Sequence, residues 1–504
     1  MTSPFQFKTT PYAHQLRAFE ASRDTEAYAL LMEQRTGKTK VALDTAAWLH
    51  QNKRIDGLVI IAPNGVHRNW AVNEIPTHLP CKHLTYVWNT GKASGKTSTE
   101  NRAKICQPRT ELSIVCVNVE ALQSDACFNF VRKFMRAARC MVVVDESQTI
   151  KTPGAARTKR VRALALKAVY RRILTGTPAV ESPFDLYSQF AFLDPKILGH
   201  LTFASFKARY GVWEEGYNRA QGRSYPKLVE YQRVEELTQK IAPHSFRVRR
   251  DECADLPPKI YQRVYFDLSA EQRKVYDELR SDYASELADG RVVTAPLVLT
   301  RYLRLQQVAS NYWPSSTTII EHEQCEGEGC EQCGFLGWAE HDIPAKQIGP
   351  INPRLEKALE LIKEEPGQVV VWARFTQDID QLMTALQPTQ SVGRYDGSIS
   401  EEGRLLVRKL FAEGGLRILI ANAAAAGRGI NLSSASLMIY YSNSFSLEQR
   451  LQSEDRAESL TKKTGTSIID LIATDTVDEE IVASLRDKES LSRRVAGDPQ
   501  RKWL

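Results

Sequence analysis

One short stretch near the N-terminus constrains the fold more than any other, Thr36-Gly37-Lys38-Thr39. An apolar run precedes it, and apolar residues at helical spacing follow it. A strand, a glycine-bearing turn and a helix in this order form a cradle in which backbone N–H groups receive phosphate oxygens. In such a cradle Lys38 reaches the β- and γ-phosphates, and the Thr39 hydroxyl holds Mg²⁺. We therefore expect these four residues to bind the phosphates of a nucleotide.

A second Gly-Lys-Thr, at residues 95–97, provides an internal comparison. Its two glycines, Gly91 and Gly95, stand one residue closer together than the phosphate-loop pattern requires, and polar residues follow. We interpret this copy, with its Lys96, as a basic surface loop. In the first copy Met32 occupies the place of the first glycine, so the tripeptide needs support from elsewhere in the chain.

That support comes from residues 140–146, an apolar, β-branched run that ends in Asp145 and Glu146. Such a run is typical of a buried parallel strand, and the carboxyl end of a strand is where an open α/β sheet binds its ligand. We expect Asp145 to hold Mg²⁺ together with Thr39, and Glu146 to polarise the attacking water. A solvated strand end is the alternative interpretation.

A further apolar run at residues 58–62 and a predicted strand that begins at Arg172 and ends in the hydroxyl-rich turn 175–178 alternate with helical stretches, which predicts a doubly wound α/β sheet. Gln15 precedes the phosphate cradle, and its amide can read the edge of an adenine. A glutamine on a helix surface is the alternative. The chain therefore predicts a site for ATP with Mg²⁺.

The composition limits the class of protein. With 504 residues the chain is too long for one core, so we expect at least two domains. No apolar run approaches the length of a membrane span, and the N-terminus lacks a signal-peptide core, so we expect no membrane partner. Nine mostly scattered cysteines suit a reducing compartment. A net charge of +7 permits a polyanionic partner without requiring one.

Taken in order, the motifs resemble those of a superfamily-two helicase of the SWI/SNF type, and the resemblance extends over nearly the whole chain. The motifs that carry it are Tyr12-Ala13-His14-Gln15, Gly37-Lys38-Thr39, Ala62-Pro63 with Asn69-Trp70, Asp145-Glu146-Ser147-Gln148, Thr175-Gly176-Thr177-Pro178, residues 246–259 and 303–307, Tyr395-Asp396-Gly397-Ser398, and residues 427–432 and 452–457. Singly these motifs are weak, but in this order they are specific.

The resemblance implies two RecA-like doubly wound lobes with ATP bound between them. It also implies that Gly429 and Gln452 contribute to nucleotide binding. The second lobe has no Gly-Lys-Thr of its own, so it should close over the first. Arg456 would then enter from across the cleft and stabilise charge on the transferring phosphoryl group, as an arginine finger does.

Two positions depart from the family pattern. The family usually has a second arginine three residues after the first, and here that position is Ser459. An arginine often found early in the fifth motif is replaced by alanine within residues 423–426. Slow hydrolysis is one consequence to expect. Substitution by Arg428 or Arg450 is the alternative.

The resemblance breaks between residues 311 and 351, where an insertion carries three of the nine cysteines. Cys325, Cys330 and Cys333, among glycines, resemble a DnaJ-type zinc module, with His322 in place of one cysteine. Two-residue spacing lets both side chains of a knuckle reach one tetrahedral ion. We expect Zn²⁺ on these four residues. His341 is a rival fourth ligand, and a metal-free loop is the alternative.

These observations divide the chain into four parts. We expect residues 1–245 to form the first lobe, 246–313 the junction and the start of the second lobe, 314–350 the zinc-binding insertion, and 351–504 the rest of the second lobe with a C-terminal helix. Two basic stretches, residues 159–172 and 247–250, have the charge needed for phosphate contacts. A solvated charged face is the commoner explanation for each.

The motifs predict an ATP-driven motor, and the resemblance implies double-stranded DNA as its track, with remodelling of branched DNA or of DNA-bound proteins as the outcome. One alternative is a strand-separating helicase on DNA or RNA. Another is a nucleotide-gated nucleic-acid-binding protein whose hydrolysis is vestigial. We expect a monomer in the cytoplasm of a bacterial or virus-infected cell, with a zinc insertion that can dock DNA or a protein partner.

Overall fold

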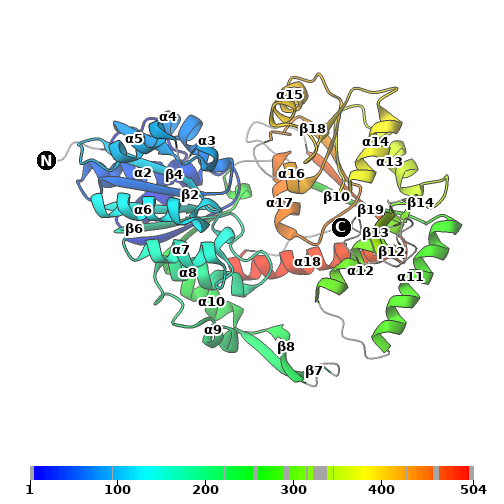
Figure 1. Cartoon of the computed structure of the whole chain (residues 1–504). Coiled ribbons are helices and arrows are strands. Elements are labelled where there is room, and N and C mark those ends of the chain that lie inside the picture. Colours follow the sequence, from blue (N-terminus) through cyan, green and yellow to red (C-terminus); the bar gives the residue numbers. More distant parts are fainter. Residues whose placement is uncertain are drawn as a thin grey trace.

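The computed structural model describes residues 5–92, 95–218, 223–253, 259–288, 295–313, 316–321, 338–343, 346–426, 430–457 and 465–498. They form two α/β lobes, the N-terminal one on the left of Figure 1 and the C-terminal one on the right. Each lobe is built on one large sheet, so the predicted architecture of two α/β lobes is confirmed. In the part of the chain so described, no helix is long and apolar enough to cross a membrane.

The first lobe contains a seven-stranded sheet in the order β3-β4-β2-β5-β6-β1-β9, with every neighbouring pair parallel. Its strands are β1 (Ala27–Met32), β2 (Gly57–Ala62), β3 (His83–Val87), β4 (Leu112–Asn118), β5 (Cys140–Asp145), β6 (Tyr170–Leu174) and β9 (Ser245–Val248). Within β2, Leu58 and Ile60 join one core cluster while Val59 and Ile61 join another. This alternation places one hydrophobic core on each face of the sheet.

Helices cover both faces of this sheet (Figure 1). One core receives side chains from α1 (Ala13–Ser22), α2 (Lys38–Gln51), α3 (Val66–Asn69) and α4 (Ile75–His78). The other receives them from α5 (Lys96–Ile105), α6 (Asp125–Ala137), α7 (Ala156–Ala165), α8 (Leu186–Leu193), α9 (Phe203–Tyr210) and α10 (Val234–Ile241). In α6, Phe130 and Phe134 are one turn apart and buried, and the Ser124 hydroxyl caps the helix by accepting from the Cys127 N–H.

The second lobe contains a six-stranded parallel sheet in the order β10-β19-β18-β15-β17-β16. Its strands are β10 (Lys259–Phe266), β15 (Gln368–Trp372), β16 (Val392–Tyr395), β17 (Ile418–Ala421), β18 (Ala435–Tyr440) and β19 (Thr466–Ala473). Its helices are α11 (Ala270–Ala288), α12 (Ala295–Ala309), α13 (Pro353–Glu364), α14 (Thr376–Leu386), α15 (Glu401–Ala412), α16 (Ala423–Ala426), α17 (Leu447–Arg456) and α18 (Val477–Ala496). Two core clusters again lie on opposite faces of the sheet.

The boundary between the sheets lies between β9 and β10. Strand β9 pairs with β1, so the first sheet continues to Val248, three residues past the expected boundary at 245. Strand β10, which begins at Lys259, opens the second sheet. The crossing of the chain from one lobe to the other therefore falls inside the stretch expected to be the junction.

Short antiparallel pairs extend from this framework. Strands β7 (Gly211–Asn218) and β8 (Arg223–Tyr231) form a hairpin that projects from the first lobe (Figure 1). In the expected insertion, β12 (Ser316–Glu321) pairs with β13 (Trp338–Ile343), and β11 (Tyr312–Trp313) pairs with β14 (Lys346–Gln347). His341 lies in β13 opposite Thr318. The four expected zinc ligands, His322, Cys325, Cys330 and Cys333, lie outside the described residues.

Helix α18 runs below the second lobe and reaches the edge of the first (Figure 1). Near its start, Ile481 and Leu485 are buried in the core of the second lobe. Near its end, Val495 is buried in a core of the first lobe, and the Thr238 hydroxyl of α10 donates to the Val495 carbonyl at 3.0 Å. The two lobes are therefore connected twice, once between β9 and β10 and once through α18.

Candidate active site between the two lobes

The phosphate loop lies between β1, which ends at Met32, and α2, which begins at Lys38. Gly37 has a φ of 89°, a left-handed conformation that favours glycine. A Cβ at this position would also lie 2.1 Å from the Gln15 Nε2 atom, so both the backbone conformation and the space favour glycine. The Gln15 amide donates to the Thr36 carbonyl at 3.1 Å and accepts from the Tyr12 N–H. Gln15 therefore supports the loop from behind, and its expected contact with adenine remains a prediction.

Lys38 is buried at the start of α2, and its side chain turns back onto the loop. The ammonium donates to the carbonyls of Met32 at 2.8 Å and Glu33 at 3.1 Å, which uses two of its three N–H groups. Burial lowers the pKa of Lys38, while the carboxylates of Glu146 and Asp145 oppose that shift. A buried ammonium facing two carboxylates is the charge pattern expected where phosphate and a divalent cation bind together.

Asp145 ends β5, and both of its oxygens accept hydrogen bonds within the protein. The Trp70 indole donates at 2.8 Å and the Glu146 N–H at 2.9 Å. Trp70 begins a π-helical turn, Trp70–Glu74, a local widening of the helix that is frequent at functional sites. Burial, with the neighbouring Glu146 charge, raises the pKa of Asp145 well above its ordinary value. A carboxylate in this setting is stabilised by a nearby cation, so Asp145 fits the role expected with Thr39 at the start of α2.

The Glu146 carboxylate is held by two amides. Gln34, in the phosphate loop, donates to one oxygen at 2.8 Å, and Gln148 donates to the other at 2.8 Å. Gln148 also accepts from the Thr175 hydroxyl at 2.8 Å, and its amide reaches Glu448 of α17 in the second lobe at 3.3 Å. The acid expected to polarise water is therefore fixed in orientation and linked to both lobes.

Arg456 is the last residue of α17, whose first turn is capped by the Ser446 hydroxyl. The Arg35 guanidinium of the phosphate loop donates to the Arg456 carbonyl at 3.3 Å across the two lobes. Burial lowers the pKa of Arg456, and the charge of Glu146 opposes this most strongly. The structure thus brings Lys38, Asp145, Glu146 and Arg456 to one place, although they come from both halves of the chain.

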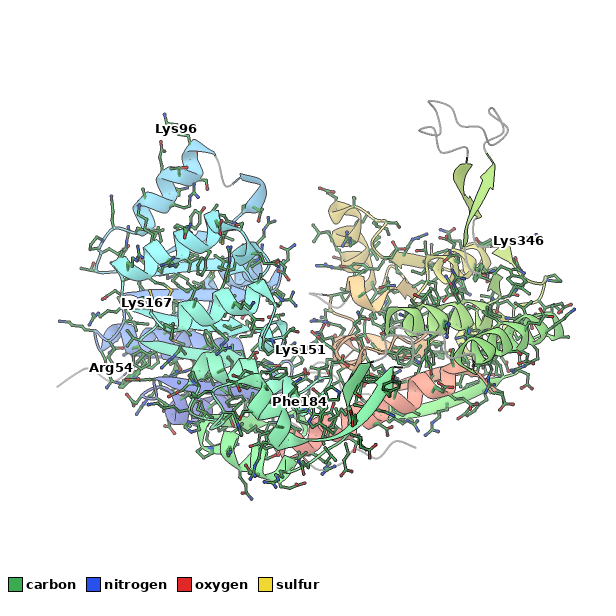
Figure 2. The ribbon with its side chains drawn as sticks, turned by 60° about the horizontal axis from the view of Figure 1, so that its bottom comes forward. Arg54, Lys96, Lys151, Lys167, Phe184 and Lys346 are labelled. Atoms are coloured by element: carbon green, nitrogen blue, oxygen red, sulfur yellow. The ribbon has the colours of Figure 1, made fainter. Side chains whose placement is uncertain are left out.

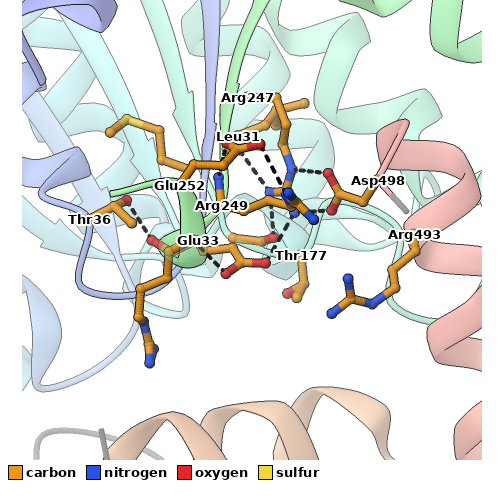
Figure 3. A network of polar contacts seen from close by, with 12 residues as sticks. Leu31, Glu33, Thr36, Thr177, Arg247, Arg249, Glu252, Arg493 and Asp498 are labelled. Atoms are coloured by element: carbon orange, nitrogen blue, oxygen red, sulfur yellow. Dashed lines mark hydrogen bonds and ion pairs between the residues drawn. The ribbon is translucent and has the colours of Figure 1, made fainter. Parts of the chain in front are cut away.

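The arginines of the lobe junction make contacts within the protein rather than forming a solvated basic patch (Figure 3). Arg247 donates to the Leu31 carbonyl at 2.8 Å and the Gly176 carbonyl at 3.0 Å, and it pairs with Asp498 at the end of α18. Arg249 pairs with Glu252, and Arg250 with Asp455. The sequence left phosphate contacts or a solvated face open for this stretch. In the structure Arg247 ties β1 to the segment that follows α18, and Arg250 pairs with Asp455 of the second lobe.

Arg450, one of the two residues considered as a substitute arginine, is held inside the second lobe. It pairs with Asp470 and with Glu454, it stacks on the Tyr440 ring, and only 4% of it is exposed. Removing it from these buried carboxylates would leave them uncompensated. Its role is therefore to hold α17 on the sheet, and Arg428, the other candidate, lies outside the described residues.

Two further residues, Gln452 and Gly429, were expected to contribute to nucleotide binding. Gln452 lies on α17 and donates to Glu448 one turn earlier at 3.0 Å, and Gly429 lies outside the described residues. The second Gly-Lys-Thr begins the exposed helix α5, and Lys96 lies at the outer end of the first lobe (Figure 2). This copy is a surface feature, as predicted, although a helix rather than a loop follows it. In the described ranges, no group of three or more His, Cys, Asp or Glu side chains has a metal-binding arrangement.

A cleft of about 530 Å³ lies at the carboxyl ends of β15 and β18, and Gln449 and Arg450 of α17 are part of its lining. Arg374 and Asn422 of the second lobe line it, together with Glu181 of the first lobe and Lys488 of α18. Lys488 pairs with Glu181 at 2.7 Å, so the cleft spans both lobes. Strand ends of an open sheet are a usual place for ligands, and this one carries cationic and amide groups.

Comparison with known proteins identifies the class. The family model for the SNF2-related domain matches residues 22–311, and the model for the helicase conserved C-terminal domain matches residues 353–459. The first match alone covers more than half of the chain. The chain therefore belongs to the SNF2-related family of helicase-like ATPases.

Two curated relatives agree with this assignment. A protein of Bacillus subtilis named as an ATP-dependent helicase/translocase, YwqA, is 25% identical over 447 residues, which is 87% of this chain and 43% of that protein. The TATA-binding protein-associated factor mot1 of Schizosaccharomyces pombe is 24% identical over 471 residues, covering 87% of this chain and 23% of that protein. The SWI2/SNF2 ATPase core of Sulfolobus solfataricus, solved with dsDNA, is 20% identical over 98% of both chains, with a TM-score of 0.41. The chain spans less than half the length of the two curated relatives.

Several site residues were not predicted from the sequence. Gln148 and Trp70 belong to quoted motifs, and Gln34 stands two residues before Thr36 of the phosphate loop, but nothing in their spacing indicated that they hold the two carboxylates. Arg35 carried no signal beyond its position in the phosphate loop. Its partner is 421 residues away in the chain, and a local pattern does not encode such a pair.

Proposed function

We propose that this chain hydrolyses ATP at the contact between its two lobes and uses the resulting opening and closing to move along double-stranded DNA. The observation that carries the proposal is the contact of the two lobes at this site: Arg35 of the phosphate loop donates to the Arg456 carbonyl, and Gln148, which holds Glu146, reaches Glu448 of the same helix α17. A site completed only by both lobes couples nucleotide handling to their relative position.

The residues divide the chemistry between them. Lys38 and the loop N–H groups bind the phosphate oxygens, and Glu146, held by its two amides, orients the attacking water and accepts its proton. Arg456 stabilises the negative charge that develops on the transferring phosphoryl group. Thr39 and Asp145 would hold Mg²⁺, which when bound neutralises phosphate charge.

Double-stranded DNA is the proposed track. The name of the Bacillus subtilis relative, a helicase/translocase, supports nucleic acid as the partner. Arg374 in the cleft supports a site for a phosphate backbone, because such binding requires cationic donors rather than base contacts, whereas Lys488 in the same cleft is already paired with Glu181. Remodelling of branched DNA or of bound proteins would follow from movement along the duplex.

Two measurements test the proposed activity. The first is the ATPase rate with single-stranded, duplex, forked and four-way DNA and with RNA, where duplex-containing DNA should stimulate most. The second pairs displacement of a third strand from a triplex with unwinding of a tailed duplex. Triplex displacement without unwinding supports translocation, whereas unwinding without triplex displacement indicates a strand-separating helicase. Nucleotide binding with no turnover on any nucleic acid indicates vestigial hydrolysis.

The place of DNA is tested by substitution. Arg374→Ala should weaken DNA stimulation and reduce the salt dependence of binding by the equivalent of about one phosphate contact. Lys167→Ala is the matched control, because Lys167 is an exposed cation of the first lobe outside the cleft (Figure 2). An effect of Lys167→Ala equal to or larger than that of Arg374→Ala would move the proposed DNA contact to residues 159–172.

We also propose that the insertion binds one Zn²⁺ through Cys325, Cys330, Cys333 and His322, with His341 as the rival for the fourth place. The spacing of the cysteines supports this proposal. Elemental analysis of reduced protein purified without chelator should give one zinc per chain, and a value near zero would end the idea. His322→Ala and His341→Ala, compared for zinc content, identify the fourth ligand. All ligands are local, so zinc removal should leave the two lobes folded.

A further inference from the structure

The backbone of Arg35 has an unusual conformation for a residue with a side chain. Its φ is 64°, in the left-handed region, which favours glycine. Six non-glycine residues in the described ranges share this property, and two of them, Arg35 and Glu146, belong to the candidate active site. Such conformations persist where surrounding contacts hold them, and they are concentrated at functional sites.

The contact that the Arg35 side chain makes has a clear physical basis. Arg456 is the last residue of α17, so its carbonyl is one of the four at the helix end that lack an intrahelical partner. The Arg35 Nη2 donates to this carbonyl at 3.3 Å, and the Leu432 N–H donates to it at 2.9 Å. A guanidinium at a helix C-terminus also interacts favourably with the negative end of the helix dipole.

The surrounding charges keep this arrangement together. Asp455, next to Arg456, pairs with Arg250 at 3.3 Å and with Lys259 at 3.5 Å. Burial, together with the charges of Arg456 and Arg250, lowers the pKa of Arg35 to about 10, so Arg35 remains charged at neutral pH. Mutual repulsion of these cations is balanced by Asp455, and the cluster lies on the side of the loop that faces the second lobe.

We propose that Arg35 is a positioning residue that ties the phosphate loop to the C-terminal end of α17 and thereby sets the place of Arg456 in the closed arrangement of the lobes. The proposal rests on the proposed ATP hydrolysis. In it, Arg35 acts through Arg456, so the two residues should behave as one unit rather than as independent contacts.

The test is a double-mutant cycle on full-length protein, with kcat and KM for ATP measured in the presence of duplex DNA. Arg35→Gly should lower kcat about tenfold, as expected for loss of one charge-assisted hydrogen bond, and change KM by less than about threefold. In an Arg456→Ala background the same change should lower kcat by less than about twofold. Arg35→Lys keeps the charge without the planar fork, so it should recover only part of the rate.

Lys53→Gly is the matched control, because Lys53 is exposed and has a φ of 55°. It relieves the same backbone conformation away from the site and should leave kcat unchanged. An active wild type with unchanged kcat in Arg35→Gly overturns this inference and leaves the proposed function standing. An equally large loss of kcat from Arg35→Gly in the wild-type and Arg456→Ala backgrounds also overturns the inference.

Hydrogen exchange provides a readout that does not depend on turnover. The Leu432 amide donates to the Arg456 carbonyl, the acceptor of the Arg35 hydrogen bond. Amide exchange at Leu432 and in residues 447–456 should therefore be faster in Arg35→Gly than in wild type or Lys53→Gly. Equal exchange in all three proteins overturns the inference. A wild type with no ATPase activity but with this exchange pattern would overturn the proposed hydrolysis alone.

Discussion

Substitution of Gly37 by alanine should disrupt the phosphate loop in a way that its geometry allows us to calculate. Gly37 has a φ of 89°, and the added Cβ would lie 2.1 Å from the Gln15 Nε2 and 3.0 Å from its Cδ. The backbone cannot move toward the ordinary region without displacing Thr36, and the Gln15 side chain is itself buried. The clash must therefore be relieved by moving the Gln15 amide.

Two terms make up the expected cost. A left-handed backbone with a Cβ costs about 1–2 kcal/mol. Moving the Gln15 amide breaks its bonds to the Thr36 carbonyl and the Tyr12 N–H, each worth about 1 kcal/mol. The total is on the order of 3 kcal/mol, which corresponds to about 6–12 °C in the melting temperature of a lobe of this size.

Scanning calorimetry measures this loss, and Gly414→Ala is its matched control. Gly414 has a φ of 80°, and an added Cβ there would meet nothing within 4 Å, so only the backbone term applies. Gln15→Ala combined with Gly37→Ala should melt higher than Gly37→Ala alone, because the obstructing amide is gone. ATP binding should be weakened in Gly37→Ala and retained in Gly414→Ala. Equal melting shifts in the two alanine variants would refute this reasoning.

Three further outcomes are expected. Lys38→Ala should lower the ATPase rate by orders of magnitude, whereas Lys96→Ala should not, and equal losses would mean that the wrong Gly-Lys-Thr was chosen. Glu146→Gln should bind ATP in a filter assay yet fail to turn it over, since an amide cannot accept the water proton. Burial raises the pKa of Asp378 from 3.8 to about 6, which corresponds to about 3 kcal/mol at 1.4 kcal/mol per unit. The folded protein has this stabilisation in full at a pH below the unfolded pKa of 3.8 and loses it as the pH rises through about 6. The free energy of unfolding of wild type relative to Asp378→Asn should therefore increase from pH 7 to pH 4.

Local patterns predicted the elements of the fold well. The apolar runs around residues 58–62 and 140–145 form β2 and β5, because a strand covered on both faces must be apolar throughout. The two-lobe division also followed from the order of the motifs. The strand order was not predictable in this way, and neither was the addition of β9 beside β1. The paired residues of β1 and β9 are more than 200 positions apart in the chain.

The site shows the same division. Lys38, Asp145 and Glu146 were predicted because each stands at a strand or helix end with a recognisable pattern. The residues that hold them, such as Trp70 and Gln34, do so through single side-chain contacts between distant segments, and no periodicity marks such contacts. Arg247 was misread for a related reason, because a run of arginines looks alike whether it faces solvent or pairs with a distant acid such as Asp498.

The double connection between the lobes has a mechanical consequence. A body attached to another at one point can rotate in any direction about it, whereas attachment at two separated points leaves rotation about the line that joins them. The crossing between β9 and β10 is one such point, and the end of α18, docked on α10, is the other. Helix α18 has 20 residues and is therefore about 30 Å long, so it acts as a stiff arm of fixed length. Once the side-chain contacts across the active site are broken, these two attachments would favour a swing of the lobes about one axis, and other rotations would require the end of α18 to leave both Arg247 and α10.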